Sequence, residues 1–277
     1  MLQIAPSAYW RHAACQRDPA LLCRRSLRDA ELAPQIRRVW QANFGVYGAD
    51  KVWHQLRREG IAIARCTVER LMRQHGLQGV RRGKRQRTTV PDPKAPCPLD
   101  RVNRQFKADH PNQLWVTDFT YVSTWQGWVY VAFVIDVFSR RIVGWRQSSS
   151  MHTEFVLDAL EQALYARRAE RDGDLVHHSD RGCQYASDAY QRTLRLLGIE
   201  CSMSRVGECY DNAVAERFFW SLKHEWTKHE SFPDLEAARL SVFKYVETFY
   251  NPVRLHQTLG YKSPDQFEAE YAPVLAA

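Results

Sequence analysis

Three apolar segments in succession, all between residues 114 and 146, constrain the fold of this chain more than any other feature. Residues 114–121 alternate between two faces, as a strand with one buried face does. Residues 128–136 and 141–146 also have the composition of strands, and the connections between the three are too short to hold a helix. Consecutive strands with short connections pair as an antiparallel meander. The sequence therefore predicts a sheet at the centre of the molecule.

The segments that follow predict further strands alternating with helices. They are an amphipathic helix at 152–168, a strand that ends at Asp180, a helix at 187–197, a short strand at 199–203 and a helix that holds Glu216. The order βββαβαβα is similar to that of the ribonuclease-H-like fold. We therefore expect an α/β (α+β) core with a mixed five-stranded sheet, preceded by an all-α helix-turn-helix domain.

Three acidic residues lie at the edges of these apolar elements: Asp118, Asp180 and Glu216. If folding brings them together, their carboxylates repel one another and lose hydration unless a cation lies between them. A pair of divalent metal ions is the interpretation that this pattern favours. Carboxylate oxygens suit Mg²⁺ or Mn²⁺, whereas Zn²⁺ prefers Cys or His ligands.

Charge is unevenly distributed along the 277 residues, although the net charge is only +8. Residues 1–90 carry 18 Lys and Arg against 6 Asp and Glu, and residues 91–277 carry 21 against 25. A basic front joined to a slightly acidic body is typical of a nucleic-acid-binding module attached to a domain that gathers carboxylates. The alternative is a solvated basic surface without a partner.

The first 78 residues predict a basic helical domain. A helix is expected from Asp29 as its N-cap, with Pro34 near its start, and two shorter helices follow near 50–59 and 65–75. The last two match a helix-turn-helix, in which the second helix enters the major groove of DNA. Its outward residues Arg65, Arg70 and Arg73 are then candidates for DNA contacts. A structural helical cluster with solvated arginines is the competing interpretation.

Residues 79–100 have the composition of a linker. The first half is basic and the second half carries four prolines, which stiffen and extend a chain. Its candidate phosphate contacts are Arg81, Arg82, Lys84 and Arg85. A plain solvated tether is the alternative. The linker separates the helical domain from a catalytic core at 101–226, which a helical extension at 227–277 follows.

Cysteine usage and hydropathy predict a location in a reducing compartment. The seven cysteines are odd in number and form no CxxC pair, which disfavours a disulfide framework and a zinc ribbon. His12, Cys15 and Cys23 have an unspecific spacing for a metal site. No apolar run approaches the roughly 18 residues of a membrane span, and the start of the chain lacks a signal-peptide pattern. We therefore expect a cytoplasmic protein.

Several motifs resemble one known family. The segments WVTDFTY around Asp118, HHSDRGCQY around Asp180 and YDNAVAERFFWSLK around Glu216 resemble the DDE signature of bacterial insertion-sequence transposases in the retroviral-integrase superfamily. The 35 residues between Asp180 and Glu216 match the spacing of that family. The front segment FGVYGADKVW and the tail NPVRLHQTLG are similar to the second-reading-frame protein of IS-three-type elements. The resemblance spans about residues 30–270.

This resemblance implies a function and its cofactors. It implies DNA cleavage at the ends of an insertion sequence and strand transfer, with Asp118, Asp180 and Glu216 as catalytic ligands of two Mg²⁺ ions, for which Mn²⁺ can substitute. It implies contacts between DNA and Lys223, for which a solvated helix lysine is the alternative. Its partners are then double-stranded DNA at the element ends and at the target, further copies of the chain, and an upstream-frame product fused to it. A nucleoid-associated cytoplasmic location follows.

Other residues near these motifs allow more than one interpretation. Asn212 is expected either to position DNA or to cap the helix of Glu216. The segment His177 to Ser179 suits either hydrogen bonding around Asp180 or packing. Asp136 ends a strand, but the family pattern assigns it no metal. Arg217 stands where the family often has Ser and is a hypothetical phosphate contact.

The tail and the overall activity also leave alternatives open. A helix is expected from 234 to 249. Arg254 and His256 beyond it either touch DNA or form a structural cap on the core. The alternatives to a transposase are a ribonuclease-H-like enzyme that only hydrolyses and a DNA-binding protein whose acidic site is a relic.

Overall fold

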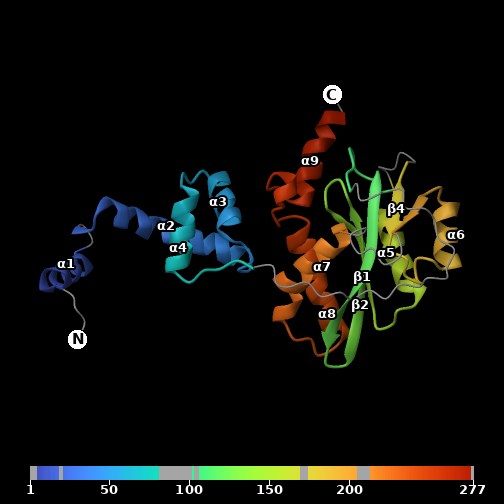
Figure 1. Cartoon of the computed structure of the whole chain (residues 1–277), viewed down its shortest axis with the longest axis horizontal. Coiled ribbons are helices and arrows are strands. Elements are labelled where there is room, and N and C mark those ends of the chain that lie inside the picture. Colours follow the sequence, from blue (N-terminus) through green and yellow to red (C-terminus); the bar gives the residue numbers. More distant parts are fainter. Residues whose placement is uncertain are drawn as a thin grey trace. The chain divides into compact units, whose positions relative to one another are not determined.

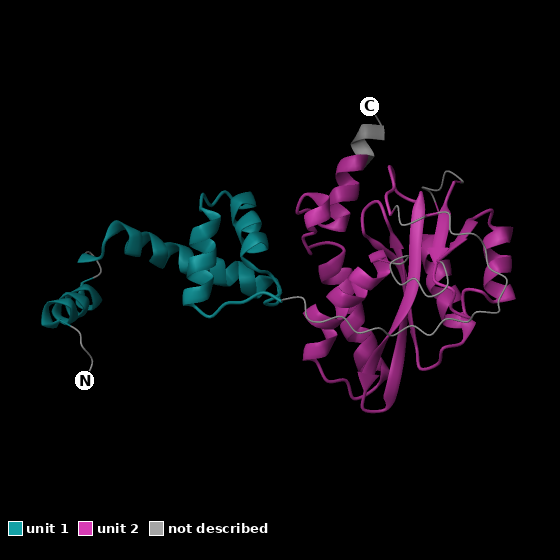
Figure 2. Cartoon of the chain, in the orientation of Figure 1, with its two compact units in different colours: residues 1–81 teal, residues 82–277 magenta. Residues whose placement is uncertain are grey.

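The computed structural model describes residues 5–18, 21–80, 102, 106–168, 174–204 and 213–275, with side chains as far as Tyr271. The chain forms two compact units, residues 1–81 and 82–277 (Figure 2). The predicted boundary near residues 79–100 agrees with this division. Most of the predicted linker, including Arg81, Arg82, Lys84 and Arg85, lies outside the described residues. The four-part division of the chain remains a prediction.

The first unit is helical, with α1 (Pro6–Arg17), α2 (Arg24–Ala42), α3 (Ala49–Arg58) and α4 (Arg65–Gln74) (Figure 1). Helices α2, α3 and α4 pack against one another. Their common core holds the buried side chains of Ile36, Val52, Leu56, Val68 and Leu71. Helices α3 and α4 are short, and a turn at Gly60 leads from one to the other. The expected pair of helices is therefore confirmed. Helix α1 buries none of its residues.

Helix α2 differs from the prediction, because it begins at Arg24 and not after Asp29. Pro34 therefore lies well inside the helix, where its missing N–H leaves the carbonyl of Ala30 without its helical partner. Ala30 is exposed, so water can satisfy that carbonyl. Asp29 is not a cap. Its carboxylate accepts a 2.7 Å bond from Arg70, which ties α2 to α4.

The second unit is built on a five-stranded sheet in the order β3-β2-β1-β4-β5. The strands are β1 (Leu114–Thr124), β2 (Gly127–Asp136), β3 (Ile142–Ser148), β4 (Val176–Ser179) and β5 (Glu200–Met203). The first three pair antiparallel, whereas β4 pairs parallel to β1 and to β5. The expected meander and the mixed sheet are confirmed. The element order is that of the ribonuclease-H-like fold.

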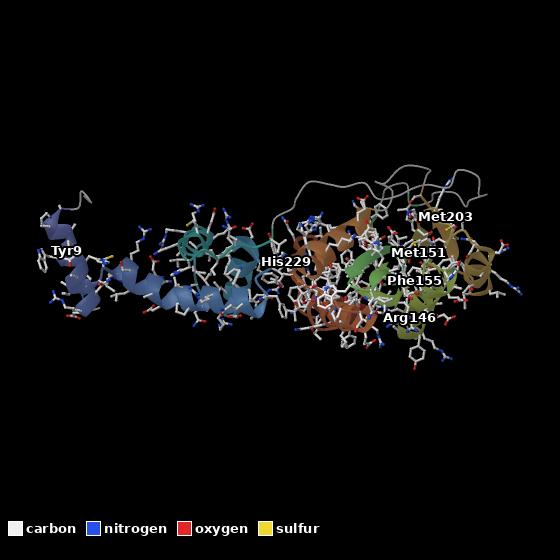
Figure 3. The ribbon with its side chains drawn as sticks, turned by 90° about the horizontal axis from the view of Figure 1, so that it is seen from below. Tyr9, Arg146, Met151, Phe155, Met203 and His229 are labelled. Carbon is white, nitrogen blue, oxygen red and sulfur yellow. The ribbon has the colours of Figure 1, made fainter. Side chains whose placement is uncertain are left out.

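Helices cover both faces of the sheet (Figure 1). Helices α5 (Thr153–Ala166) and α6 (Asp188–Leu196) pack over one face, and α7 (Ala213–Glu225) and α8 (Leu235–Phe243) pack over the other. The core beneath α5 and α6 includes Phe155 of α5 and Met203 of β5, which are labelled in Figure 3. Helix α5 approaches β3 closely at Gly144, where a Cβ would lie 2.1 Å from the carbonyl oxygen of Ala159.

The C-terminal segment packs on the same unit as the sheet. After the short η3 (Thr227–His229), α8 continues into a π-helical segment η4 (Lys244–Tyr250), and η5 (Gln257–Leu259) and α9 (Pro264–Leu275) follow. The single helix expected at 234–249 is therefore α8 joined to η4. Asn251 explains why the helix stops, because its side chain bonds both the N–H and the carbonyl of Ile142 on β3 at 3.0 Å. Among the described helices, none is long and apolar enough to cross a membrane.

Candidate active site

The pairing of β1 with β4 brings Asp118 and Asp180 to the same level of the sheet. Val116 is the register partner of His178, and each aspartate follows two residues after its member of this pair. Neighbouring strands lie about 4.8 Å apart. Asp118 lies inside β1 and Asp180 directly follows β4, so two acids that are 62 positions apart in the sequence are carried by adjacent parallel strands, as the element order predicts.

Local backbone bonds orient each carboxylate. The N–H of Phe119 donates to Oδ1 of Asp118 at 2.8 Å. The N–H of Gly182 donates to Oδ1 of Asp180 at 2.9 Å, in the turn that follows β4. Both residues are half-buried. Each aspartate thus has one oxygen held by the backbone, which pre-orients the group for a ligand.

A buried tyrosine lies close to both acids. Tyr185 is 0% exposed and packs against Phe119, with ring centroids 6.3 Å apart. Burial raises the pKa of the Tyr185 hydroxyl well above its ordinary value, and the carboxylates of Asp118 and Asp180 raise it further. Burial also raises the pKa of Asp180, and the bond from Gly182 partly offsets this. The pair of aspartates therefore rests on an apolar floor that disfavours two negative charges.

Helix α7 places Glu216 on the same side of the sheet as Asp118. Phe133 is the cross-strand partner of Asp118, and the two side chains share a face. The ring of Phe133 contacts Phe218 and Phe219 of α7 at centroid distances of 4.6 and 4.9 Å. Glu216 lies in the first turn of this helix, half-buried.

The three acids do not form a complete metal site in this structure. Among the described residues, which include Asp118, Asp180 and Glu216, no group of three His, Cys, Asp or Glu side chains is arranged to hold a metal ion. Strand pairing sets the two aspartates, whereas the position of Glu216 depends on α7. Residues 205–212 precede this helix and lie outside the described residues, and Asn212 is one of them.

The histidines before Asp180 hold the sheet together. His177 is fully buried, and its Nε2 lies 3.0 Å from the hydroxyl of Tyr190 on α6. His178 is fully buried on the other side of β4, with Nδ1 2.9 Å from Ser202 of β5. These bonds join the histidines to other core side chains and not to Asp180, so they support the packing interpretation of this segment.

Asp136 has a structural role, as expected of a residue without a metal. It is 0% exposed and accepts bonds from the N–H groups of Asn112 at 2.8 Å and Phe138 at 2.9 Å. Arg167 lies 3.9 Å away and pairs with Glu268 of α9. This network fixes the turn after β2 and the C-terminal helix.

The basic residues predicted to contact DNA differ in how strongly they already interact with other side chains of the protein. Lys223 is half-buried on α7 and lies over the ring of Tyr121. In the helical unit, Arg65 pairs with Asp50 at 3.2 Å, and Arg73 pairs with Glu69 at 3.3 Å. Both arginines are exposed. Arg70 is half-buried in its bond to Asp29, so it is the least available of the three for DNA.

Arg254 belongs to a buried ion pair. Its Nε donates to Glu225 of α7 at 2.6 Å, and its Nη2 donates to Ser221 at 3.1 Å. Tyr245 adds a 3.0 Å bond to the same carboxylate. The arrangement matches the structural-cap interpretation of this residue, because it joins the tail of the chain to α7.

The comparisons with known proteins agree with this architecture. The integrase core domain matches residues 108–209 and again 197–264, and the HTH-like domain matches residues 26–85. The transposase for insertion sequence element IS629 of Shigella sonnei is 50% identical over 270 residues, which cover 98% of this chain and 90% of that protein. The chain belongs to the insertion-sequence transposases.

A second relative agrees with this assignment. The putative transposase for insertion sequence element IS986/IS6110 of Mycobacterium tuberculosis (strain CDC 1551 / Oshkosh) is 48% identical over 274 residues, covering 98% of this chain and 96% of that protein. A chain of the simian T-cell lymphotropic virus intasome in complex with PP2A regulatory subunit B56 gamma is similar over 64% of this chain and 60% of that chain, with 17% identity and a TM-score of 0.48.

Family membership gives the coarse features of the activity. The transposase is an enzyme with an integrase core domain, its family uses divalent metal ions, and DNA is its partner. Two residues of this region were not singled out from the sequence. Tyr185 stands inside the HHSDRGCQY motif, so its position after Asp180 could have indicated it. Arg140 lies in the largely buried turn between β2 and β3 and carries no sequence signal.

Proposed function

We propose that the transposase cuts and joins DNA at a site formed by Asp118, Asp180 and Glu216, which together bind two Mg²⁺ ions, or Mn²⁺ as a substitute. One observation carries this proposal: the Val116–His178 register sets Asp118 of β1 and Asp180 just after β4 at the same level of the sheet that α7 covers. The activity comprises cleavage at the ends of an insertion sequence and transfer of the freed strand to a target.

The chemistry of the donor set fits a hard divalent cation. All three groups offer carboxylate oxygens, which Mg²⁺ and Mn²⁺ prefer. The apolar floor at Tyr185 makes two neighbouring negative charges unfavourable, and a cation between them relieves that cost. The backbone bonds from Phe119 and Gly182 limit the rotation of the two aspartates and so reduce the entropy lost on binding.

Glu216 completes the site through a movement of its side chain or of the first turn of α7. The contact of Phe133 with Phe218 and Phe219 anchors the helix two and three residues after Glu216, so only a local adjustment is required. A site that becomes complete when metal and DNA bind links cutting to the presence of substrate.

The protein groups have distinct roles in this scheme. Asp118, Asp180 and Glu216 would hold the two ions, which would supply activation of an attacking water or DNA 3′-hydroxyl and charge stabilisation for the leaving oxygen. Asp118 and Asp180 provide fixed anionic ligands, and Glu216 provides the adjustable one.

DNA contacts and partners outside this site complete the proposal. Lys223 and Asn212 contact the DNA end next to the acids. The first 78 residues are the helix-turn-helix-type DNA-binding domain, 79–100 the linker, 101–226 the catalytic core and 227–277 its helical extension.

The transposase acts as a homo-oligomer on paired DNA ends, and also as a fusion with an upstream-frame product. It acts in the bacterial cytoplasm, at the nucleoid. The remaining DNA contacts are Arg65, Arg70, Arg73, Arg81, Arg82, Lys84 and Arg85.

A strand-transfer assay with precleaved element ends tests the proposal. Asp118→Asn, Asp180→Asn and Glu216→Gln should each lower DNA cutting and joining at least about 100-fold while DNA binding is kept. Asp188→Asn, an exposed acid in the first turn of α6, is the matched control. Joined product from the wild-type chain excludes an enzyme that only hydrolyses, and full activity of Asp118→Asn would show that the acidic site is a relic.

A further inference from the structure

A small basic pocket opens beside the helix that carries Glu216. Its volume is about 210 Å³, and its walls come from the start of α7, the turn between β2 and β3, and the segment after η4. The side chains that matter for its chemistry are Arg140, Arg217, Arg254, Tyr250, His256 and Thr258. All of them belong to the second unit.

The three arginines of the pocket are not equally neutralised. Arg254 is paired with Glu225, so its charge is matched inside the protein. For Arg140 and Arg217, no carboxylate of the described residues lies within ion-pair distance, although Asp136 acts on Arg140 from farther away. Burial lowers the pKa of Arg140, and the neighbouring Arg217 lowers it further. Two guanidinium groups thus face one cavity and repel each other.

The backbone at Arg140 adds a second cost. Its φ is +64°, in the left-handed region that a side chain with a Cβ occupies at a cost of about 1 kcal/mol. A glycine or asparagine would fill this turn position with less strain. The chain instead holds a half-buried arginine there, whose side chain lines the pocket.

We propose that this pocket binds one backbone phosphate of the DNA strand that Glu216 helps to cut. This inference rests on the proposed function, because it assumes that the strand passes α7. A phosphate oxyanion relieves the repulsion between Arg140 and Arg217, and guanidinium groups bind phosphate through paired N–H donors. Thr258 also lines the pocket, and its hydroxyl offers a further donor.

The location in the chain restricts which phosphate this is. Arg217 follows Glu216 directly, so a phosphate held by Arg217 lies near the phosphate that is cut and belongs to the same DNA end. The contact involves no base edge, so it positions the strand without reading its sequence. It therefore serves element ends and target DNA alike.

Salt-dependent binding of a labelled random-sequence duplex to the full chain, measured by fluorescence anisotropy in EDTA, tests this inference. Arg217→Gln and the double variant Arg140→Gln/Arg217→Gln should weaken binding about 10-fold. The double variant should reduce the slope of log affinity against log salt by about 1, the value for one phosphate, and not by about 2. Arg217→Lys keeps the charge and should keep most of the slope, and Arg239→Gln, an exposed residue of α8, is the control.

Thermal unfolding separates binding from folding. Without DNA, the Gln variants should melt at a temperature equal to or above that of the wild type, because the repulsion is removed. An unchanged slope in the double variant overturns the inference, as does weaker binding accompanied by a lower melting temperature in every variant. A third outcome also overturns the inference. If inorganic phosphate stabilises the wild type while the double variant binds DNA as well as the wild type does, the pocket binds a free anion and not the DNA backbone.

The proposed metal site is tested separately. Binding of Mn²⁺ to the acids, measured by electron paramagnetic resonance, should be the same in the wild type and in Arg217→Gln. If Mn²⁺ fails to bind the wild type, the proposed function is contradicted but the phosphate pocket is not, because duplex binding is measured without metal.

Discussion

The ammonium group of Lys223 lies 4.3 Å from the centre of the Tyr121 ring. Lys223 comes from α7, two turns after Glu216, and Tyr121 comes from β1, three residues after Asp118. Strand β4 pairs with β1 only from Leu114 to Val116, so the edge of β1 beyond that point is open to α7. Burial lowers the pKa of Lys223. The contact therefore holds a cation beside the strand that carries Asp118, about 10 Å along that strand from the acid.

The Lys223–Tyr121 contact should be measurable as a coupling energy. In a double-mutant cycle of Lys223→Met and Tyr121→Leu, urea unfolding should give a coupling of about 0.5–1 kcal/mol, the usual range for a partly exposed cation–π pair. Tyr121→Phe keeps the ring face and should retain the coupling. Additive effects of the two changes would show that the contact contributes no stability.

Asp180→Asn should stabilise the metal-free protein. Burial raises the pKa of Asp180, so its charged form is unfavourable next to Asp118 unless a cation is present. An asparagine oxygen can still accept the bond from Gly182. We expect the free energy of unfolding to rise by roughly 1 kcal/mol in EDTA, and the stabilisation by Mn²⁺ to disappear. A lower melting temperature than that of Asp188→Asn would contradict this.

His177 should make the fold sensitive to acid. Burial lowers the pKa of His177 from 6.5 to about 3. Between these values the unfolded chain takes up a proton that the folded chain excludes, so stability is complete above pH 6.5 and is lost as the pH falls toward 3. The loss amounts to about 5 kcal/mol at the acid end, at 1.36 kcal/mol per pH unit.

The variant His177→Gln removes this proton uptake and can still bond the hydroxyl of Tyr190. Its unfolding free energy, measured by urea denaturation between pH 7 and pH 4, should vary less with pH than that of the wild type. His229, an exposed residue labelled in Figure 3, supplies the control His229→Gln. A pH dependence equal to that of the wild type would mean that His177 does not cause the acid sensitivity.

Breaking the Arg254–Glu225 pair should be among the most damaging changes in the core. Both side chains are less than 10% exposed. Arg254→Met leaves a buried carboxylate without its partner and should cost about 3–5 kcal/mol of unfolding free energy. Arg254→Met/Glu225→Gln should cost less than the sum of the single changes. The exposed pair Arg239–Glu236 is the comparison, and Arg239→Met should cost less than about 0.5 kcal/mol.

The strands could be predicted from sequence because each has a strong local signal. The run from Trp115 to Asp118 alternates, and turn residues separate β2 from β3, so the meander needed no knowledge of the tertiary contacts. The predicted start of α2 was wrong. Asp29 is a residue type that favours the N-cap position, but its carboxylate bonds Arg70 instead, and that bond forms only when α4 packs against α2. The end of the C-terminal helix could be predicted locally, because Pro252 follows Asn251 and cannot continue a helix. The bonds of Asn251 to Ile142, 109 residues away, could not.

The amino-acid sequence alone determined the family, the order of strands and helices along the chain and the three acids proposed as metal ligands, because strand patterning and motif spacing are properties of neighbouring residues. Only the tertiary structure decided that Asp118 and Asp180 lie at the same level, that Glu216 depends on α7 for its position, and that Arg140 and Arg217 share a pocket. Register and the meeting of like charges arise from contacts between distant segments, and these carry no local signal in the chain.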